Sequence, residues 1–115
     1  MSRAQPEAAI QRAVFEHLAW RGVKGLFAFH PPNGGARRPI EAAILKGLGV
    51  VAGVPDVIIV NAGQVYGLEL KREGGRLTPI QLETQQAMRT AGAHIATAAG
   101  IDAALAQLKQ WGLLS

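Results

Sequence analysis

Apolar residues recur along the chain at two spacings, and the spacing separates expected helices from expected strands. Helical spacing covers residues 6–21, 40–48, 78–91 and 101–111. Shorter runs rich in β-branched and aromatic residues cover 26–30, 57–60, 64–71 and 93–97, and these predict strands. The expected order is therefore helix, strand, helix, two-stranded hairpin, helix, strand, helix.

This order predicts an α/β fold. A hairpin followed by a crossover helix and a further strand gives a mixed β-sheet of about four strands, flanked by helices. At 115 residues the chain has the usual size of one domain with one core. We therefore expect a single domain over residues 1–115.

Residues 57–71 predict a hairpin whose turn sets the register of two charged side chains. Its two β-rich runs are separated by Asn61-Ala62-Gly63, and Asn and Gly are typical of tight hairpin turns. If the turn is centred on Ala62-Gly63, counting outward places Asp56 opposite Glu69. A three-residue loop would shift this register by one.

Asp56 and Glu69 thus form a predicted pair of facing carboxylates. Directly opposed residues on antiparallel strands have Cβ atoms roughly 4.5–5.5 Å apart, and like charges there repel each other. Lys71 follows Glu69 by two residues and points to the same face. A divalent cation would compensate the two negative charges directly, whereas Lys71 alone would do so less completely.

Composition narrows the chemistry of this site. The chain has no cysteine, which excludes disulfides, thiolate zinc sites and a cysteine nucleophile. No glycine-rich loop followed by Lys-Ser or Lys-Thr is present, so a nucleotide P-loop is not expected. An oxygen-rich site favours Mg²⁺ or Mn²⁺ over zinc. The net charge of +4 gives mild support for a nucleic acid partner.

Three histidines are scattered along the chain, at His17, His30 and His94. Each is better explained by packing or surface exposure than by metal binding. His30 ends its strand beside a basic loop, so it is the one that could lie near a site.

Glu7 begins the first helix and falls on the same face as Ile10, Val14 and Leu18. Two interpretations are open from the residues. Glu7 either interacts with the positive end of the helix dipole or is a third carboxylate that approaches Asp56 and Glu69.

Two loops carry residues suited to phosphate contacts. Residues 31–39 form a rigid Pro-Pro entry followed by a flexible, basic segment. Exposed backbone N–H groups beside arginines can bind phosphates, although a solvated connecting loop explains the composition equally well. The candidate DNA contacts are Asn33, Gly34, Arg37 and Arg38, together with Arg72 and Arg76 in the turn after the hairpin.

The third helix has a clear start. Thr78 is a good N-cap, Pro79 suits the first helical position, and Gln81 completes a capping box. This arrangement gives Gln81 a structural role.

The Pro55-Asp56 and Glu69-Leu70-Lys71 pieces resemble the PD-(D/E)xK nuclease signature. With Asn33-Gly34-Gly35 upstream and the 77–81 segment downstream, the ordered set is similar to the small stand-alone VRR-Nuc domains of phages and bacteria. The resemblance covers nearly the whole chain, from Glu7 to about Ala98.

The resemblance implies a PD-(D/E)xK, restriction-endonuclease-like core of order α-β-α-β-β-α-β-α. It implies that Asp56, Glu69, the Leu70 carbonyl and Glu7 bind Mg²⁺ or Mn²⁺. Lys71 would orient or deprotonate the attacking water or stabilise the developing charge, and Gln81 would lie close to the active site.

The implied function is a metal-dependent DNA endonuclease, a phosphodiesterase acting on duplex or, more specifically, branched or junction DNA. The alternative is a non-catalytic DNA-binding or protein-interaction module in which Asp56, Glu69 and Lys71 form an ion-pair cluster. The resemblance also implies a homodimer, for which Trp20, Trp111, Leu113 and Leu114 could supply an apolar contact patch. The N-terminus lacks the pattern of a signal peptide, and we expect a cytoplasmic protein of a bacterium or a phage-infected host cell.

Overall fold

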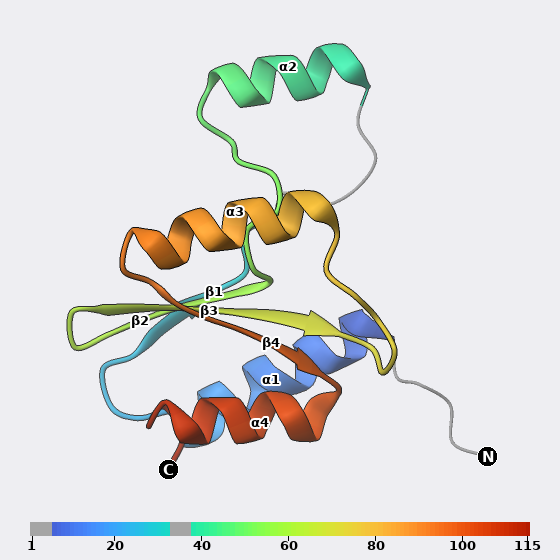
Figure 1. Ribbon diagram of the computed structural model, residues 1–115. Helices are drawn as coiled ribbons and strands as arrows, with labels where there is room; N and C mark the ends of the chain where they lie inside the picture. The colour runs from blue at the N-terminus through green and yellow to red at the C-terminus, as the bar shows by residue number, and fades with distance from the viewer. Residues whose placement is uncertain (1–5, 33–37) are drawn as a thin grey trace.

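The computed structural model describes residues 6–32 and 38–115, and within them the elements follow the predicted order (Figure 1). The helices are α1 (Glu7–Arg21), α2 (Pro39–Gly47), α3 (Pro79–Thr90) and α4 (Ile101–Gln110). The strands are β1 (Phe27–Phe29), β2 (Val57–Asn61), β3 (Gln64–Lys71) and β4 (His94–Ala99). The predicted α/β fold is confirmed. Among the described residues, no helix has the length and apolarity that a membrane crossing requires.

The strands form one mixed sheet in the order β1-β2-β3-β4. The first three strands pair antiparallel, and β4 pairs parallel to β3. Strand β4 extends two residues beyond the predicted end because its pairing with β3 continues as far as Lys71 and Ala99. The sheet therefore places β3 between an antiparallel and a parallel neighbour.

The hairpin has the predicted two-residue turn. Asn61 pairs with Gln64, and both turn residues, Ala62 and Gly63, have positive φ (50° and 78°), as a type I′ turn requires. The pairing continues to Val57 opposite Leu68. One step further along both strands, Asp56 lies opposite Glu69, so the predicted register is confirmed.

Helices cover both faces of the sheet (Figure 1). Helices α1 and α4 lie on one face, where the apolar stripe of α1 meets the alternating inward residues of the hairpin. Helix α3 lies on the opposite face, the same face to which Glu69 and Lys71 point. The core residues from α1, the hairpin and α4 include Ile10, Val14, Leu18, Val57, Ile59, Leu68, Leu70, Ala104 and Leu108.

The C-terminal residues do not form the predicted contact patch. Leu113 and Leu114 are buried in the core, and Trp111 packs against it with only partial exposure. The chain turns back after α4, so that Val23 N–H donates to the Leu113 carbonyl at 3.0 Å. The prediction that these leucines form an apolar surface was wrong, because it did not foresee this return against the end of α1. Trp20 alone of the four residues is largely exposed.

The segment that leads into β2 is held against α3. The Thr84 hydroxyl donates to the Ala52 carbonyl at 2.6 Å. Gly53 has a φ of +87°, and a Cβ built there would lie 2.6 Å from the Ile80 carbonyl oxygen. Glycine is therefore required at this position for two reasons, the backbone conformation and the close approach of α3.

We expect Gly53→Ala to destabilise the fold more than Gly49→Ala does. Both changes put a Cβ at positive φ, which costs about 1–2 kcal/mol. Only Gly53→Ala adds a clash with fixed backbone, worth a further 1–3 kcal/mol, roughly, since nothing lies within 4 Å of the Cβ position at Gly49. Urea unfolding of the two variants measures the difference, and equal decreases in stability would contradict the close packing on α3.

Candidate active site

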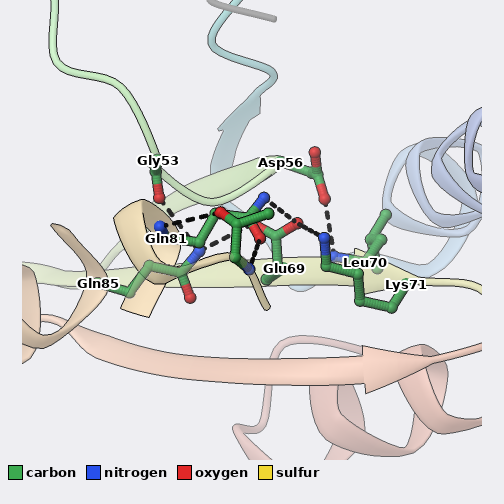
Figure 2. A network of polar contacts seen from close by, with 8 residues as sticks. Gly53, Asp56, Glu69, Leu70, Lys71, Gln81 and Gln85 are labelled. Carbon is green, nitrogen blue, oxygen red and sulfur yellow. Dashed lines mark hydrogen bonds and ion pairs between the residues drawn. The ribbon is translucent and has the colours of Figure 1, made fainter. Parts of the chain in front are cut away.

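Asp56 caps the open end of the hairpin. Its Oδ2 accepts a hydrogen bond from the Leu70 backbone N–H at 2.8 Å. The regular pairing of β2 and β3 ends with Val57 opposite Leu68, two residues before Leu70. The Leu70 N–H therefore lacks a backbone partner on β2, and the Asp56 side chain takes that place. The contact fixes the Asp56 carboxylate at the edge of β3 (Figure 2).

The Leu70 carbonyl, a predicted metal ligand, lies on the same edge. The N–H and C=O of one strand residue point to the same side of the strand. Because the Leu70 N–H points at Asp56, its carbonyl also points toward the β2 side. Asp56 and the Leu70 carbonyl thus lie on the same side of β3.

Glu69 is the buried carboxylate of the pair, with 1% of its surface exposed. Its Oε1 accepts a hydrogen bond from the Gln85 amide at 2.8 Å, and its Oε2 accepts one from the Gln81 amide at 3.4 Å. Figure 2 shows both glutamines reaching Glu69 from α3. The Lys71 ammonium nitrogen lies 3.7 Å from Oε2 and is also buried.

Gln81 carries out two roles with one side chain. The capping box is confirmed: the Gln81 backbone N–H donates to the Thr78 hydroxyl at 3.3 Å, and the Thr78 N–H donates to the Gln81 side-chain oxygen at 2.9 Å. The remaining amide nitrogen donates to Glu69. The start of α3 and the orientation of the Glu69 carboxylate therefore depend on the same residue.

Gln85 belongs to the site and was not predicted. It lies one turn after Gln81 on α3, and its amide nitrogen donates both to Glu69 and to the Gly53 carbonyl at 3.2 Å. Its side-chain oxygen is buried and finds no hydrogen-bond partner within the described part of the chain. The spacing of four from Gln81 was the available signal, because such residues share a helix face.

The surroundings of Glu69 raise its pKa from 4.5 to about 8. Desolvation by burial is the largest cause, followed by hydrogen bonding and repulsion from Asp56. Lys71 and Gln85 act in the opposite direction and stabilise the ionised carboxylate. The protein alone thus compensates the two facing carboxylates only in part.

Glu7 opens onto the same region from α1. It lines a cavity of about 500 Å³ together with Gln11, Arg12, His30 and Asp56. Glu7 and Asp56 thus line one cavity, whereas Glu69 is not among its lining residues, so a role of Glu7 as a third carboxylate stays a prediction. Among the described residues, however, no three His, Cys, Asp or Glu side chains lie close enough together to form a complete metal site by themselves.

His30 is the histidine that lies at the site. Its Nδ1 is 2.7 Å from the Asp56 backbone carbonyl, and since a carbonyl only accepts hydrogen bonds, Nδ1 carries the proton. His94 instead pairs with Gln64 at 2.9 Å on the far part of the hairpin. These positions match what the sequence suggested for both residues.

The candidate DNA-contacting arginines differ in whether their charge is already paired within the protein. Arg72 and Arg76 are exposed on the turn that directly follows Lys71. Arg38 is exposed as well, but its guanidinium donates twice to the Glu41 carboxylate, at 2.8 and 2.9 Å, so its charge is balanced locally. Asn33, Gly34 and Arg37 lie outside the described residues.

Two solved structures resemble this chain, whereas no family model and no curated protein matches its sequence. A solved structure called "VRR_NUC domain protein" aligns with a TM-score of 0.80 and 27% identity, covering 96% of this chain and 90% of that one. The VRR-Nuc resemblance is confirmed. A second structure, called "VRR_NUC domain", aligns with a TM-score of 0.61 and 18% identity over 90% of this chain and 94% of that one, which supports the fold.

The VRR-Nuc neighbours indicate a nuclease-family domain. The residues that carried the sequence resemblance, Asp56, Glu69 and Lys71, are brought together at one end of β3. Their roles as metal ligands and catalytic residues remain predictions.

We expect the metal-free protein to lose stability as the pH rises from about 5 to about 8. The folded state holds the Glu69 proton more tightly than the unfolded chain does, with a pKa of about 8 against 4.5. Protonation of Glu69 therefore contributes its full stabilisation below pH 4.5, and this contribution is lost as the pH rises through 8. Thermal melts in EDTA across this range measure the effect.

Glu69→Gln should flatten this decline, because the side chain no longer titrates. Glu73→Gln is the matched control, since Glu73 is exposed on the turn after β3 and should leave the decline unchanged. If the wild-type protein and Glu69→Gln lost the same stability over this pH range, burial would not raise the pKa of Glu69.

Proposed function

We propose that this protein is a Mg²⁺- or Mn²⁺-dependent DNA endonuclease that hydrolyses phosphodiester bonds. The observation that carries the proposal is the grouping of Asp56, Glu69 and Lys71 at the open end of the hairpin, with Lys71 3.7 Å from Glu69. Two facing carboxylates, one buried, favour a bound cation, and a buried lysine beside them is free of the bulk solvent that would otherwise screen its charge.

The donor set fits a hard, hydrated cation. Asp56, Glu69 and the Leu70 carbonyl would hold it, and Glu7 could contribute from across the cavity. Mg²⁺ binds in proteins through one or two carboxylates and keeps several waters, so a complete cage of protein ligands is not needed. When bound, the metal supplies charge neutralisation at the phosphate and an activated water.

Lys71 cannot ligate a cation, so its role lies with the reacting groups. A buried ammonium at this position can orient the attacking water or stabilise negative charge that develops on the phosphate. Gln81 and Gln85 each donate to one oxygen of the Glu69 carboxylate and so hold it in one orientation. Such fixed positioning is a requirement for efficient catalysis.

Branched or junction DNA is the substrate class that we propose, following the sequence resemblance. The net charge of +4 and the exposed Arg72 and Arg76 beside the site support a polyanionic substrate. Labelled flap, four-way junction, nicked and linear duplex DNAs, incubated with Mg²⁺ or Mn²⁺, distinguish these substrates directly.

Substitutions at Asp56 and Lys71 separate metal binding from the chemical step. Asp56→Asn should abolish Mn²⁺ binding and cleavage while the fold persists. Lys71→Ala should leave Mn²⁺ affinity equal or higher, because a competing positive charge is gone, yet lower cleavage by about 10²–10³-fold. Calorimetry with Mn²⁺ and single-turnover cleavage measure the two quantities, and Asp102→Asn on the exposed side of α4 is the control.

Two results would contradict this assignment. Undiminished cleavage by a folded Asp56→Asn protein would exclude the proposed metal site. If Lys71→Ala chiefly lowers the melting temperature and neither variant changes Mn²⁺ binding, the three residues form a structural ion-pair cluster in a non-catalytic module.

Arg72→Ala and Arg76→Ala should each weaken DNA binding. Each should also reduce the salt dependence of the binding constant by roughly one unit, if the arginine neutralises one phosphate. Lys109→Ala is the control, since Lys109 lies on the last turn of α4, away from the end of the sheet that carries Asp56. Binding titrations at several salt concentrations give the slopes. Equal slopes for all three variants and the wild-type protein would show that this turn does not bind DNA.

A further inference from the structure

The cavity beside Asp56 extends along one flank of helix α1. Ala8, Arg12 and Phe15 line it from the helix at spacings of four and three, and His30 and Asp56 line it from the sheet. Its volume of about 500 Å³ lies in the range of sites that hold a small ligand. We refer to this space as the α1 cavity. The proposed metal ligands occupy only part of its wall.

The Arg12 guanidinium is the positive group of the α1 cavity. It is exposed, and it forms no ion pair with any residue that the structure describes. Glu16 follows one helical turn later, yet the two side chains do not pair. Arg38, by contrast, pairs with Glu41 at 2.8 Å. Arg12 therefore keeps its charge and its hydrogen-bond donors for a ligand.

Both sides of the α1 cavity are held in place by the fold. The contact of 2.7 Å between His30 Nδ1 and the Asp56 carbonyl joins the end of β1 to the start of β2. On the other side, Phe15 packs against the hydrophobic core and anchors the flank of α1 that carries Arg12. The cavity is thus formed before any ligand enters it.

Charges of opposite sign are separated within the α1 cavity. Glu7 and Asp56 are acidic, and Arg12 follows Glu7 by five residues on α1, a rise of about 7.5 Å along the helix axis. This rise is close to the separation of neighbouring phosphates along one DNA strand. A scissile phosphate held beside Asp56 would therefore place the next phosphate of the same strand within reach of Arg12.

Other ligands fit this arrangement less well. The guanidinium repels a further cation, and within residues 6–32 and 38–115 no three His, Cys, Asp or Glu side chains group into a metal site. A free anion is repelled by Glu7 and Asp56. A phosphodiester within a DNA strand avoids this difficulty, because its neighbour on the strand brings it to the cavity.

We propose that Arg12 binds the phosphodiester next to the scissile one, so that the α1 cavity is a phosphate subsite for the cleaved strand. Gln11 also lines the cavity, and its amide can donate a second hydrogen bond. The inference rests on the proposed nuclease function and extends it, since a bound neighbouring phosphate fixes the scissile group relative to Asp56.

A chemical change in the DNA tests the contact at single positions. A methylphosphonate replaces one charged phosphate by an uncharged group, and it is placed on either side of the cleavage site mapped with the wild-type protein. At one adjacent position it should slow single-turnover cleavage by about 10- to 100-fold, the effect of losing a hydrogen bond to a charged group. Arg12→Ala should show this loss with unmodified DNA, and no further loss with the methylphosphonate at that position.

Lys24→Ala is the matched control. It removes one positive charge from an exposed residue in the turn between α1 and β1, at the end of α1 farthest from Glu7. This variant should cleave unmodified DNA as the wild-type protein does and should keep the full sensitivity to the methylphosphonate.

DNA binding without cleavage separates this proposal from the nuclease assignment. With Ca²⁺ in place of Mg²⁺ and a short labelled duplex as the probe, Arg12→Ala should reduce the salt dependence of the binding constant by about 0.9 unit. Arg12→Lys keeps the charge and should restore the slope. If the wild-type protein cleaves no DNA, the proposed function fails, and a reduced slope for Arg12→Ala then still supports a phosphate site in the α1 cavity.

Three results would overturn the subsite and leave the nuclease assignment intact. The first is an Arg12→Ala protein with wild-type cleavage and a wild-type salt slope. The second is additive losses from Arg12→Ala and the methylphosphonate at every position, because additive effects show that the two groups do not interact. The third is an Arg12→Ala protein that circular dichroism shows to be unfolded, which would give this exposed arginine a structural role instead.

Discussion

The repulsion between two facing carboxylates is the constraint on which this structure depends. The hairpin register places Asp56 beside Glu69 at the end of a largely apolar sheet. The nearby polar groups stabilise these two carboxylates. The Leu70 N–H donates to Asp56, and Gln81, Gln85 and Lys71 surround Glu69. The compensation is incomplete, as the raised pKa of Glu69 shows. A site that remains short of positive charge is suited to a cation.

Much of this arrangement could be predicted because it is set by local sequence. The Asn61-Ala62-Gly63 turn fixes the pairing of the hairpin, and the pairing fixes the position of Asp56 relative to Glu69. The start of α3 was also predictable, since capping depends on residues only three positions apart. In both cases the residues that decide the structure lie within a few positions of each other along the chain.

The parts that could not be predicted depend on long-range packing. Gln85 shares a helix face with Gln81, but that spacing does not specify its partners: its contacts with Glu69 and Gly53 form only when α3 packs over them. Leu113 and Leu114 resemble a loose apolar tail, but the backbone pairing of Gly22 with Leu114 returns them to the core. Helix α2 has good helical residues, and only its place in the fold reveals that nothing in the described chain covers its apolar side.

The central position of β3 has a consequence for local stability. The strand pairs on both sides, and Glu69, Leu70 and Lys71 are all buried. By contrast, β1 is a short edge strand and α2 lies outside the packed layers. Amide hydrogens near the site can therefore exchange with solvent only through nearly global opening, whereas those of α2 exchange through small local fluctuations. The chain thus combines a rigid end, which holds its charged side chains, with an edge that can rearrange without disturbing them.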